Sequence, residues 1–179
     1  MSALLRAAVL FGLVLLASHA GAQSPDDCYQ ASLRDDDQNL IRVCTRVLDK
    51  GGLSKSDLST TLNNRGLGYL RNKEYDKAII DFSEAILINP KNAYAFDNRG
   101  DAWREKGNYD RALADYNEAL SIDPTFASAL LNRGITFEQQ GDKTRARQDY
   151  EAALNLKGTR AIDDWARRQA RQRLDRLGR

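Results

Sequence analysis

Histidine is almost absent from this sequence. The 179 residues contain a single one, His19, and it lies within an N-terminal stretch that has the features of a removable leader. A mature chain without histidine cannot build a Ser–His or Cys–His nucleophile pair. A glycine-rich loop of the kind that cradles phosphate groups is also missing. We therefore expect no catalytic residues, no cofactor and no enzymatic activity.

An excess of one sign of charge is missing as well. The chain has 27 Lys and Arg residues against 25 Asp and Glu residues, and loss of the leader removes Arg6, which leaves a net charge of +1. Such a balance does not favour a nucleic acid as the partner, because nucleic-acid binding needs a concentrated basic surface. Export would also separate the protein from nucleic acid.

Long hydrophobic runs are confined to the N-terminus. Arg6 precedes an apolar run over residues 7–17, and residues 20–22 form an Ala-Gly-Ala cleavage site. These features predict a signal peptide over residues 1–22, a mature start at Gln23 and a periplasmic or secreted location. A retained membrane anchor is the alternative, but the run is shorter than the roughly 20 residues that a spanning helix needs.

Cysteine occurs only twice, as Cys28 and Cys44. Both would survive cleavage, and an exported pair usually forms a disulfide; two buried free thiols are the alternative. Their separation matches no zinc pattern, and we expect no metal site. The aspartates at positions 35–37 lack the glycine and the distal glutamate of a calcium loop. They predict a solvated turn that caps the following helix.

The most informative feature is the tripeptide Asn-Arg-Gly, which begins at Asn64, Asn98 and Asn132 and so recurs every 34 residues. Small and aromatic residues keep the same period after each glycine. A fixed period of about 34 with this pattern predicts stacked helix–turn–helix units. The recurring positions are Tyr69, Trp103 and Phe137; Ala78, Ala112 and Ala146; Phe82, Tyr116 and Tyr150; and Ala85, Ala119 and Ala153.

On these residues the chain resembles the tetratricopeptide repeat (TPR) family over roughly Ser59 to Arg160. The resemblance implies an all-α fold, a right-handed α-solenoid of antiparallel helix hairpins, with repeats at residues 59–92, 93–126 and 127–160. Ser54, Asn108 and Asp142 are expected to cap helices. The expected repeat helices cover residues 55–71, 74–88, 93–106, 109–122, 127–140 and 143–156.

Two atypical segments are expected to flank the repeats. Residues 23–58 predict a degenerate hairpin with helices near 26–33 and 38–50. Counting back by the repeat period aligns Cys28 with Leu62 and Cys44 with Ala78, so a disulfide would tie the two helices together. Residues 161–179 predict a C-terminal capping helix with a polar outer face. An apolar stripe that includes Trp165 would face the repeats, while seven arginines from Arg160 to Arg179 leave contact with an anionic membrane surface as the alternative.

The repeated glycines and arginines have a packing explanation. Glycine inside a helix costs about 1 kcal/mol relative to alanine, so its recurrence at three equivalent positions implies that a side chain there would clash. Gly66, Gly100 and Gly134 are therefore expected where paired helices approach most closely. The arginines that precede them, Arg65, Arg99 and Arg133, are expected to support the scaffold through their stems and nearby acids.

In TPR proteins the first helices of successive repeats line a concave groove, and the resemblance maps this groove onto the chain. Three asparagines recur there, and a carboxamide can both donate and accept hydrogen bonds. They resemble the asparagine ladder in the TPR region of O-GlcNAc transferase and predict a protein or peptide partner bound as an extended segment. The alternative is that they bond only within the scaffold. The predicted groove residues are Asn64, Asn98, Asn132, Asn63, Leu67, Arg71, Tyr94, Asp97, Asp101, Arg104, Leu131 and Ile135.

Some TPR proteins bind the C-terminal carboxylate of a chaperone through a carboxylate clamp. That pattern requires lysine where Asn63 stands, asparagine at Leu67, lysine at Ser128 and arginine at Asn132. Only Asn98 fits the pattern, so we do not expect this chain to bind a chaperone carboxylate.

Overall fold

The computed structural model describes residues 24–156 and 161–178. This part of the chain forms helices and contains no strand. Every helix end between residues 24 and 156 lies within one residue of its predicted position, and the C-terminal helix ends at Leu177. The predicted signal peptide lies outside the described residues. The helices are α1 (Pro25–Ser32), α2 (Asp37–Lys50), α3 (Lys55–Arg71), α4 (Tyr75–Ile88), α5 (Ala93–Glu105), α6 (Tyr109–Ile122), α7 (Ala127–Gln139), α8 (Lys143–Asn155) and α9 (Ala161–Leu177).

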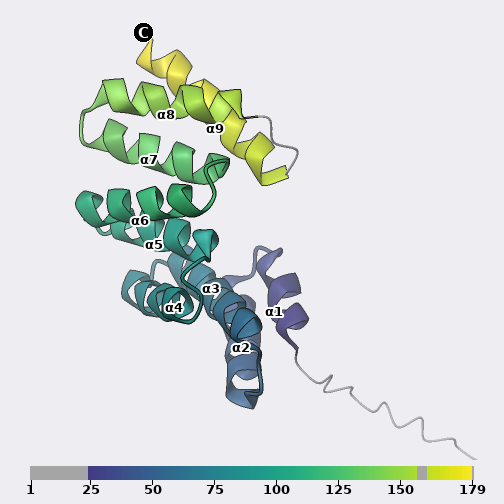
Figure 1. The fold of residues 1–179 in the computed structure, drawn as a ribbon. Helices are drawn as coiled ribbons and strands as arrows, with labels where there is room; N and C mark the ends of the chain where they lie inside the picture. Colours follow the sequence, from purple (N-terminus) through teal and green to yellow (C-terminus); the bar gives the residue numbers. More distant parts are fainter. Residues whose placement is uncertain (1–23, 157–160, 179) are drawn as a thin grey trace, which may run out of the picture.

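The helices pair into antiparallel hairpins that stack in chain order (Figure 1). Each repeat is one hairpin: α3 with α4, α5 with α6, and α7 with α8. The second helix of one repeat packs against the first helix of the next, and α3, α5 and α7 also contact one another in series. The expected all-α solenoid is confirmed, and its first helices share one face.

Polar caps explain where the helices begin. Ser54, Asn108 and Asp142 each accept a hydrogen bond from the backbone N–H three residues later, at 3.1, 3.3 and 2.9 Å. Asp36 does the same for α2 at 2.9 Å, so the aspartate turn has the predicted capping role. These bonds satisfy N–H groups that have no partner inside the helix.

Each repeated glycine lies against an aromatic ring of its paired helix. A Cβ added at any of the three would lie 2.6 Å from a ring carbon, which is closer than carbon atoms can pack. The close approach predicted from the glycines is therefore confirmed. The glycine and ring pairs are Gly66 with Phe82, Gly100 with Tyr116, and Gly134 with Tyr150. The six repeated alanines on the second helices are all fully buried.

Each repeated arginine forms a bidentate ion pair with the aspartate sixteen residues later. The nitrogen–oxygen distances are 2.7 to 2.9 Å. Arg99 and Arg133 also donate to the preceding repeat, at Ser83 (3.0 Å) and Asn117 (2.7 Å). The arginines therefore join helices within a repeat and join one repeat to the next. The pairs are Arg65 with Asp81, Arg99 with Asp115, and Arg133 with Asp149.

A disulfide between Cys28 and Cys44 joins α1 to α2, as predicted. Both sulfurs are completely buried, in a small apolar cluster with Leu40 and Val47. Both helices pack against α3, so this hairpin occupies the place of a repeat that precedes the first regular one.

At the other end, α9 packs against α7 and α8. Ala166 and Ala170 are fully buried against the last repeat, in the manner expected of a capping helix. Trp165 departs from the predicted apolar stripe, because its side chain is 46% exposed. Neighbouring residues on a helix point about 100° apart, so the turn that buries Ala166 directs Trp165 outward. Two of the seven arginines, at positions 160 and 179, lie outside the described residues.

Candidate functional site

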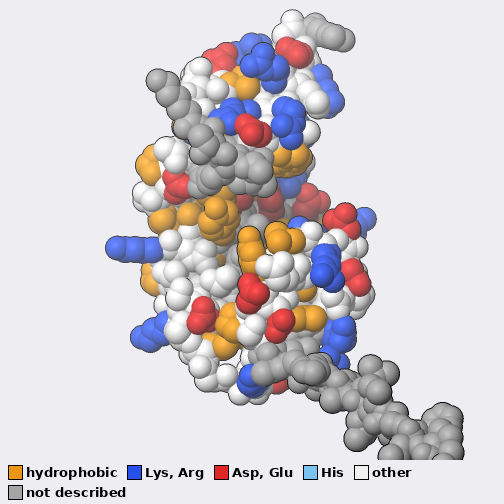
Figure 2. Space-filling model, turned by 90° about the vertical axis from the view of Figure 1, so that its right-hand side faces the viewer, with side chains coloured by type: hydrophobic (Ala, Val, Ile, Leu, Met, Phe, Trp, Pro, Cys, Tyr) orange, Lys and Arg blue, Asp and Glu red, His pale blue; other side chains and the backbone are white. Residues whose placement is uncertain are grey.

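The face shared by α3, α5 and α7 contains a cavity of about 370 Å³. Figure 2, turned by 90° from Figure 1, shows a hollow at about mid-height with hydrophobic side chains beside it. Seven of the predicted groove residues meet here, namely Asn63, Asn64, Leu67, Arg71, Tyr94, Asp97 and Asn98. The other lining residues are Thr60, Asn92, Phe126 and Ser128.

One wall of the cavity is apolar. Leu67 lies on α3, and the rings of Tyr94 and Phe126 meet edge to face with their centres 4.9 Å apart. Tyr94 remains 49% exposed, so much of its surface is open to a ligand. Aromatic side chains of this kind contribute strongly to binding because they bury a large area.

Two polar atoms in the cavity wall have no hydrogen-bond partner among the described residues. These are Nδ2 of Asn64 and Oγ of Ser128, whose residues are 7% and 5% exposed. A buried polar group without a partner costs about 1–3 kcal/mol. A ligand that pairs with these atoms would recover that free energy.

The other two asparagines of the ladder bond to the repeat before them. Asn98 donates to Oδ1 of Asn63 at 2.9 Å. Asn132 donates from its carboxamide nitrogen to Asp97 at 3.1 Å and to Asp101 at 3.3 Å. Asn64 is thus the ladder member whose nitrogen has no partner in the described chain.

The floor of the groove carries two neighbouring carboxyl groups. Asp97 is 5% exposed, and burial, with the nearby charge of Asp101, raises its pKa well above the usual value. Burial also raises the pKa of Asp101, while the positive charge of Arg104 opposes the rise. Asp101 accepts hydrogen bonds from Arg104 at 3.1 Å and from the Tyr116 hydroxyl at 2.7 Å. The carboxyl group of Asp101 is therefore already paired with a cation and a hydroxyl within the protein.

Asp101 and Arg104 line a second depression of about 260 Å³ that adjoins the first through Arg71. Lys73 and Glu105 bring one further charge of each sign to it, so the depression has no dominant sign. The remaining lining residues are Leu70 and Tyr75.

Leu131 is not an open groove residue, whereas Ile135 is half-buried. Leu131 is completely buried in the cluster that contains Ala166 and Ala170 of α9, and Ile135 packs against the same cluster. Placing Leu131 in the groove was wrong, because α9 covers this part of α7. Leu131 therefore supports the scaffold.

Thr60 and Ser128 occupy repeat positions that the family resemblance also assigns to the groove, whereas two lining residues were missed from the sequence, Asn92 and Phe126. They lie 34 residues apart, directly before α5 and α7. Extending the repeat register one position upstream of each first helix would have found them.

Within residues 24–156 and 161–178, no three His, Cys, Asp or Glu side chains gather as metal ligands would. The helices described there are too short or too polar to cross a membrane.

Family profiles decide the classification. Residues 59–92 and 127–159 match a profile described as "Tetratricopeptide repeat", and residues 100–141 match one described as "TPR repeat". The matched residues make up more than half of the chain. The chain belongs to the tetratricopeptide repeat family. None of the curated proteins matches the sequence of this TPR protein.

Solved TPR domains share the fold. The second TPR of Spaghetti (RPAP3), bound to the HSP90 peptide SRMEEVD, is 27% identical with a TM-score of 0.54, over 56% of this chain and 93% of that one. The Arabidopsis OM64 TPR domain is 27% identical with a TM-score of 0.56, over 67% and 99%. The crystal structure of MamA, at 20% identity, has a TM-score of 0.62 over 76% and 80%, a likeness of fold alone.

Proposed function

We propose that this TPR protein is a protein-interaction module that binds an extended polypeptide segment along the face of α3, α5 and α7. The observation that carries the proposal is the cavity of about 370 Å³, which has an apolar wall and an unpartnered amide nitrogen on Asn64. An extended peptide offers side chains for the wall and backbone carbonyls for the amide. The peptide-bound TPR of RPAP3 supports the proposal.

The ligand differs in kind from a chaperone C-terminus. Leu67 and Ser128 stand where a carboxylate clamp needs an amide and a lysine, and Asn132, in place of the clamp arginine, donates to two carboxylates. A free carboxylate group would find few cations here, so binding depends on backbone pairing and apolar contact.

Export is part of the proposal. It is supported by the apolar run and cleavage site in residues 1–22 and by the disulfide of the N-terminal hairpin, a bond typical of oxidising compartments. N-terminal sequencing of protein from its own cells is expected to find a start at Gln23, or nearby at Gly21. Unprocessed chains in the cytoplasm would refute export.

A second candidate function uses α9. Arg168, Arg171 and Arg176 are exposed on this helix, so it offers a cationic surface to an anionic envelope or membrane. Sedimentation with vesicles that contain anionic lipid tests this candidate. Binding that falls with added salt and disappears on deletion of residues 160–179 would favour α9 over the groove.

The groove is tested by selecting linear twelve-residue peptides from a phage-displayed library on the immobilised mature protein. Binding of the selected peptides is then measured by fluorescence anisotropy. Asn64→Ala removes the unpartnered donor and is expected to weaken binding about three- to tenfold, which corresponds to one neutral hydrogen bond.

The control is Lys77→Glu, a charge reversal at an exposed position on α4. It should leave the affinity unchanged, and the melting temperature of Asn64→Ala should stay near that of the wild type. Failure to select any peptide, or selected peptides that ignore Asn64→Ala, would show that the groove is not the binding site.

A further inference from the structure

We propose that the cavity on the face of α3, α5 and α7 accepts a basic side chain, lysine or arginine, of the bound polypeptide, with Asp97 as its counter-ion. This inference rests on the proposed function and adds the chemistry of the ligand.

Asp97 differs from the other buried aspartates of the repeats. Asp81, Asp115 and Asp149 are each held by two nitrogens of an arginine. Asp97 is equally buried, but no Lys or Arg nitrogen of the described residues lies within 4 Å of it, and it accepts a hydrogen bond only from the neutral Asn132. A buried carboxylate without a cation is costly, and a ligand cation would remove that cost.

The rest of the cavity fits the stem of such a side chain. Lysine and arginine carry a positive charge on an apolar chain that packs well against apolar surface. Leu67, Tyr94 and Phe126 supply that surface, and aromatic rings also attract cations. Next to them, the unpartnered atoms of Asn64 and Ser128 are placed to pair with the peptide backbone beside the basic residue.

The cations already nearby are engaged elsewhere. Arg71 lines the same cavity, but its guanidinium lies 3.7 Å from Asp37 and donates to the Ser32 carbonyl at 3.4 Å. Arg104 is paired with Asp101 and with Glu105. Asp97 is therefore the carboxyl group of the cavity that has no cation in direct contact, and the charge of Arg104 offsets its own only from a distance. The acidic peptide SRMEEVD bound by the RPAP3 domain has the opposite sign to the ligand proposed here.

Protonation gives the proposal a second signature. The groups whose charges act on Asp97 are Asp101 and Arg104; the hydroxyl of Tyr116 is also close by, and Arg71 lines the same cavity. Burial and Asp101 raise the pKa of Asp97, so a ligand cation must compete with a proton. Binding of a basic residue should therefore strengthen as the pH rises from 5 to 8, while an uncharged residue should show no such trend.

The test uses three pools of fluorescein-labelled nonapeptides, with flanking positions randomised over neutral residues. The central residue is lysine, its uncharged analogue norleucine, or glutamate. Fluorescence anisotropy with the mature, disulfide-bonded protein should show the lysine pool binding about tenfold more tightly than the norleucine pool, since lysine can form a charge-assisted hydrogen bond with Asp97 and the norleucine side chain offers no donor. The glutamate pool should bind most weakly.

Asp97→Asn is the decisive variant, because the asparagine oxygen can still accept the hydrogen bond from Asn132. It should remove both the lysine preference and its pH dependence while norleucine peptides still bind. The matched control is Asp110→Asn on the exposed side of α6, which should retain the preference. Circular dichroism confirms that both variants are folded.

The outcomes separate the two proposals. Equal binding of all three pools would overturn the basic-residue inference and leave peptide binding in the groove intact. A preference for glutamate, or a lysine preference that survives Asp97→Asn, would also overturn the inference alone. If no pool binds, both this inference and the proposed function fail.

Discussion

Replacing Gly100 with alanine tests how tightly the helices of the central repeat are packed. The new Cβ would lie 2.6, 2.9 and 3.0 Å from three ring carbons of Tyr116. The ring cannot retreat freely, because it is fully buried and its hydroxyl is bound to Asp101. Overpacking typically costs about 1–3 kcal/mol, and the anchored ring favours the upper end of that range.

Helix propensity acts in the opposite direction, since alanine is better than glycine inside a helix by about 1 kcal/mol. The steric term should prevail, with a net loss of about 2 kcal/mol in the free energy of unfolding. For a chain of this length that lowers the melting temperature by about 4–8 °C, measurable by circular dichroism.

A double-mutant cycle checks the cause. Tyr116→Leu removes the ring atoms that the new Cβ would meet, so Gly100→Ala should cost much less in that background than in the wild type. An unchanged or raised melting temperature for Gly100→Ala alone would refute the reasoning, as would strict additivity in the cycle.

Three further predictions follow from the scaffold and the groove floor. Arg99→Ala would leave Asp115 buried without its cation and should lower the free energy of unfolding by about 2 kcal/mol in urea titrations, less than for a fully buried pair because Arg99 is 22% exposed; an unchanged urea midpoint would contradict this. Reduction of the Cys28–Cys44 bond, which closes a loop worth about 3 kcal/mol, should speed amide exchange in α1 and α2 but hardly in α5 to α8; two free thiols in protein from its own compartment would rule out the bond. Asp97→Asn should raise the melting temperature at pH 7, because a carboxyl whose folded pKa is raised destabilises the fold once it ionises. That gain should vanish near pH 4, where the wild-type carboxyl is protonated, and a gain independent of pH would show that the charge is not responsible.

The period of 34 residues explains why the fold could be predicted from the sequence. A residue repeated in three equivalent places has a packing reason that does not depend on distant parts of the chain, as the Gly100–Tyr116 contact illustrates. Caps such as Asn108 and Asp142 are local as well, because each acts on an N–H three residues away. Helix ends and repeat boundaries therefore followed from local patterns.

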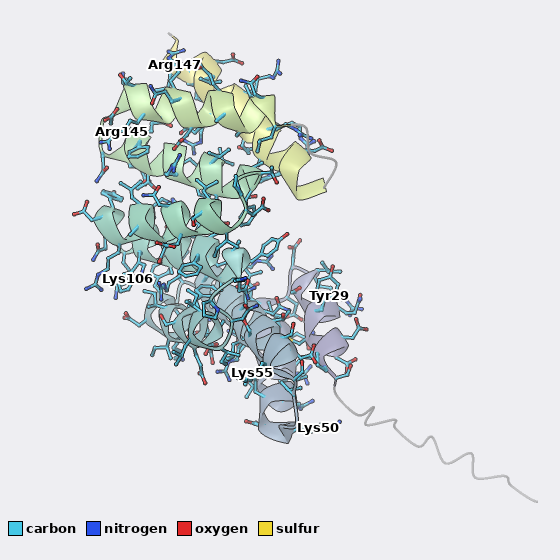
Figure 3. All side chains as sticks on the ribbon, in the orientation of Figure 1. Tyr29, Lys50, Lys55, Lys106, Arg145 and Arg147 are labelled. Atoms are coloured by element: carbon cyan, nitrogen blue, oxygen red, sulfur yellow. A yellow bond between two sulfur atoms is a disulfide. The ribbon has the colours of Figure 1, made fainter. Side chains whose placement is uncertain are left out.

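The chemistry of the groove was harder to predict from the sequence, because it depends on contacts between successive repeats. The sequence placed Asn132 correctly on the shared face, but its partners, Asp97 and Asp101, are recognisable only once α5 and α7 lie side by side. Leu131 was misplaced for a similar reason, since its burial involves α9, a segment outside the repeat pattern. Figure 3 shows how densely side chains from neighbouring helices meet along the stack.

Hydrogen bonds between residues 35 positions apart join each repeat to the one before it. Repeat one offers an acceptor at Asn63 and repeat two at Asp97, and each following repeat brings an asparagine donor. Repeat three has Leu131 in the acceptor position, and the corresponding donor position on α9 is Ala166.

A second copy of repeat two, inserted after the first, would find a matching group at both junctions. A second copy of repeat three would instead turn an asparagine toward Leu131 and leave its amide without an acceptor. We therefore expect the array to accept an added copy of repeat two at a lower cost in stability than an added copy of repeat three.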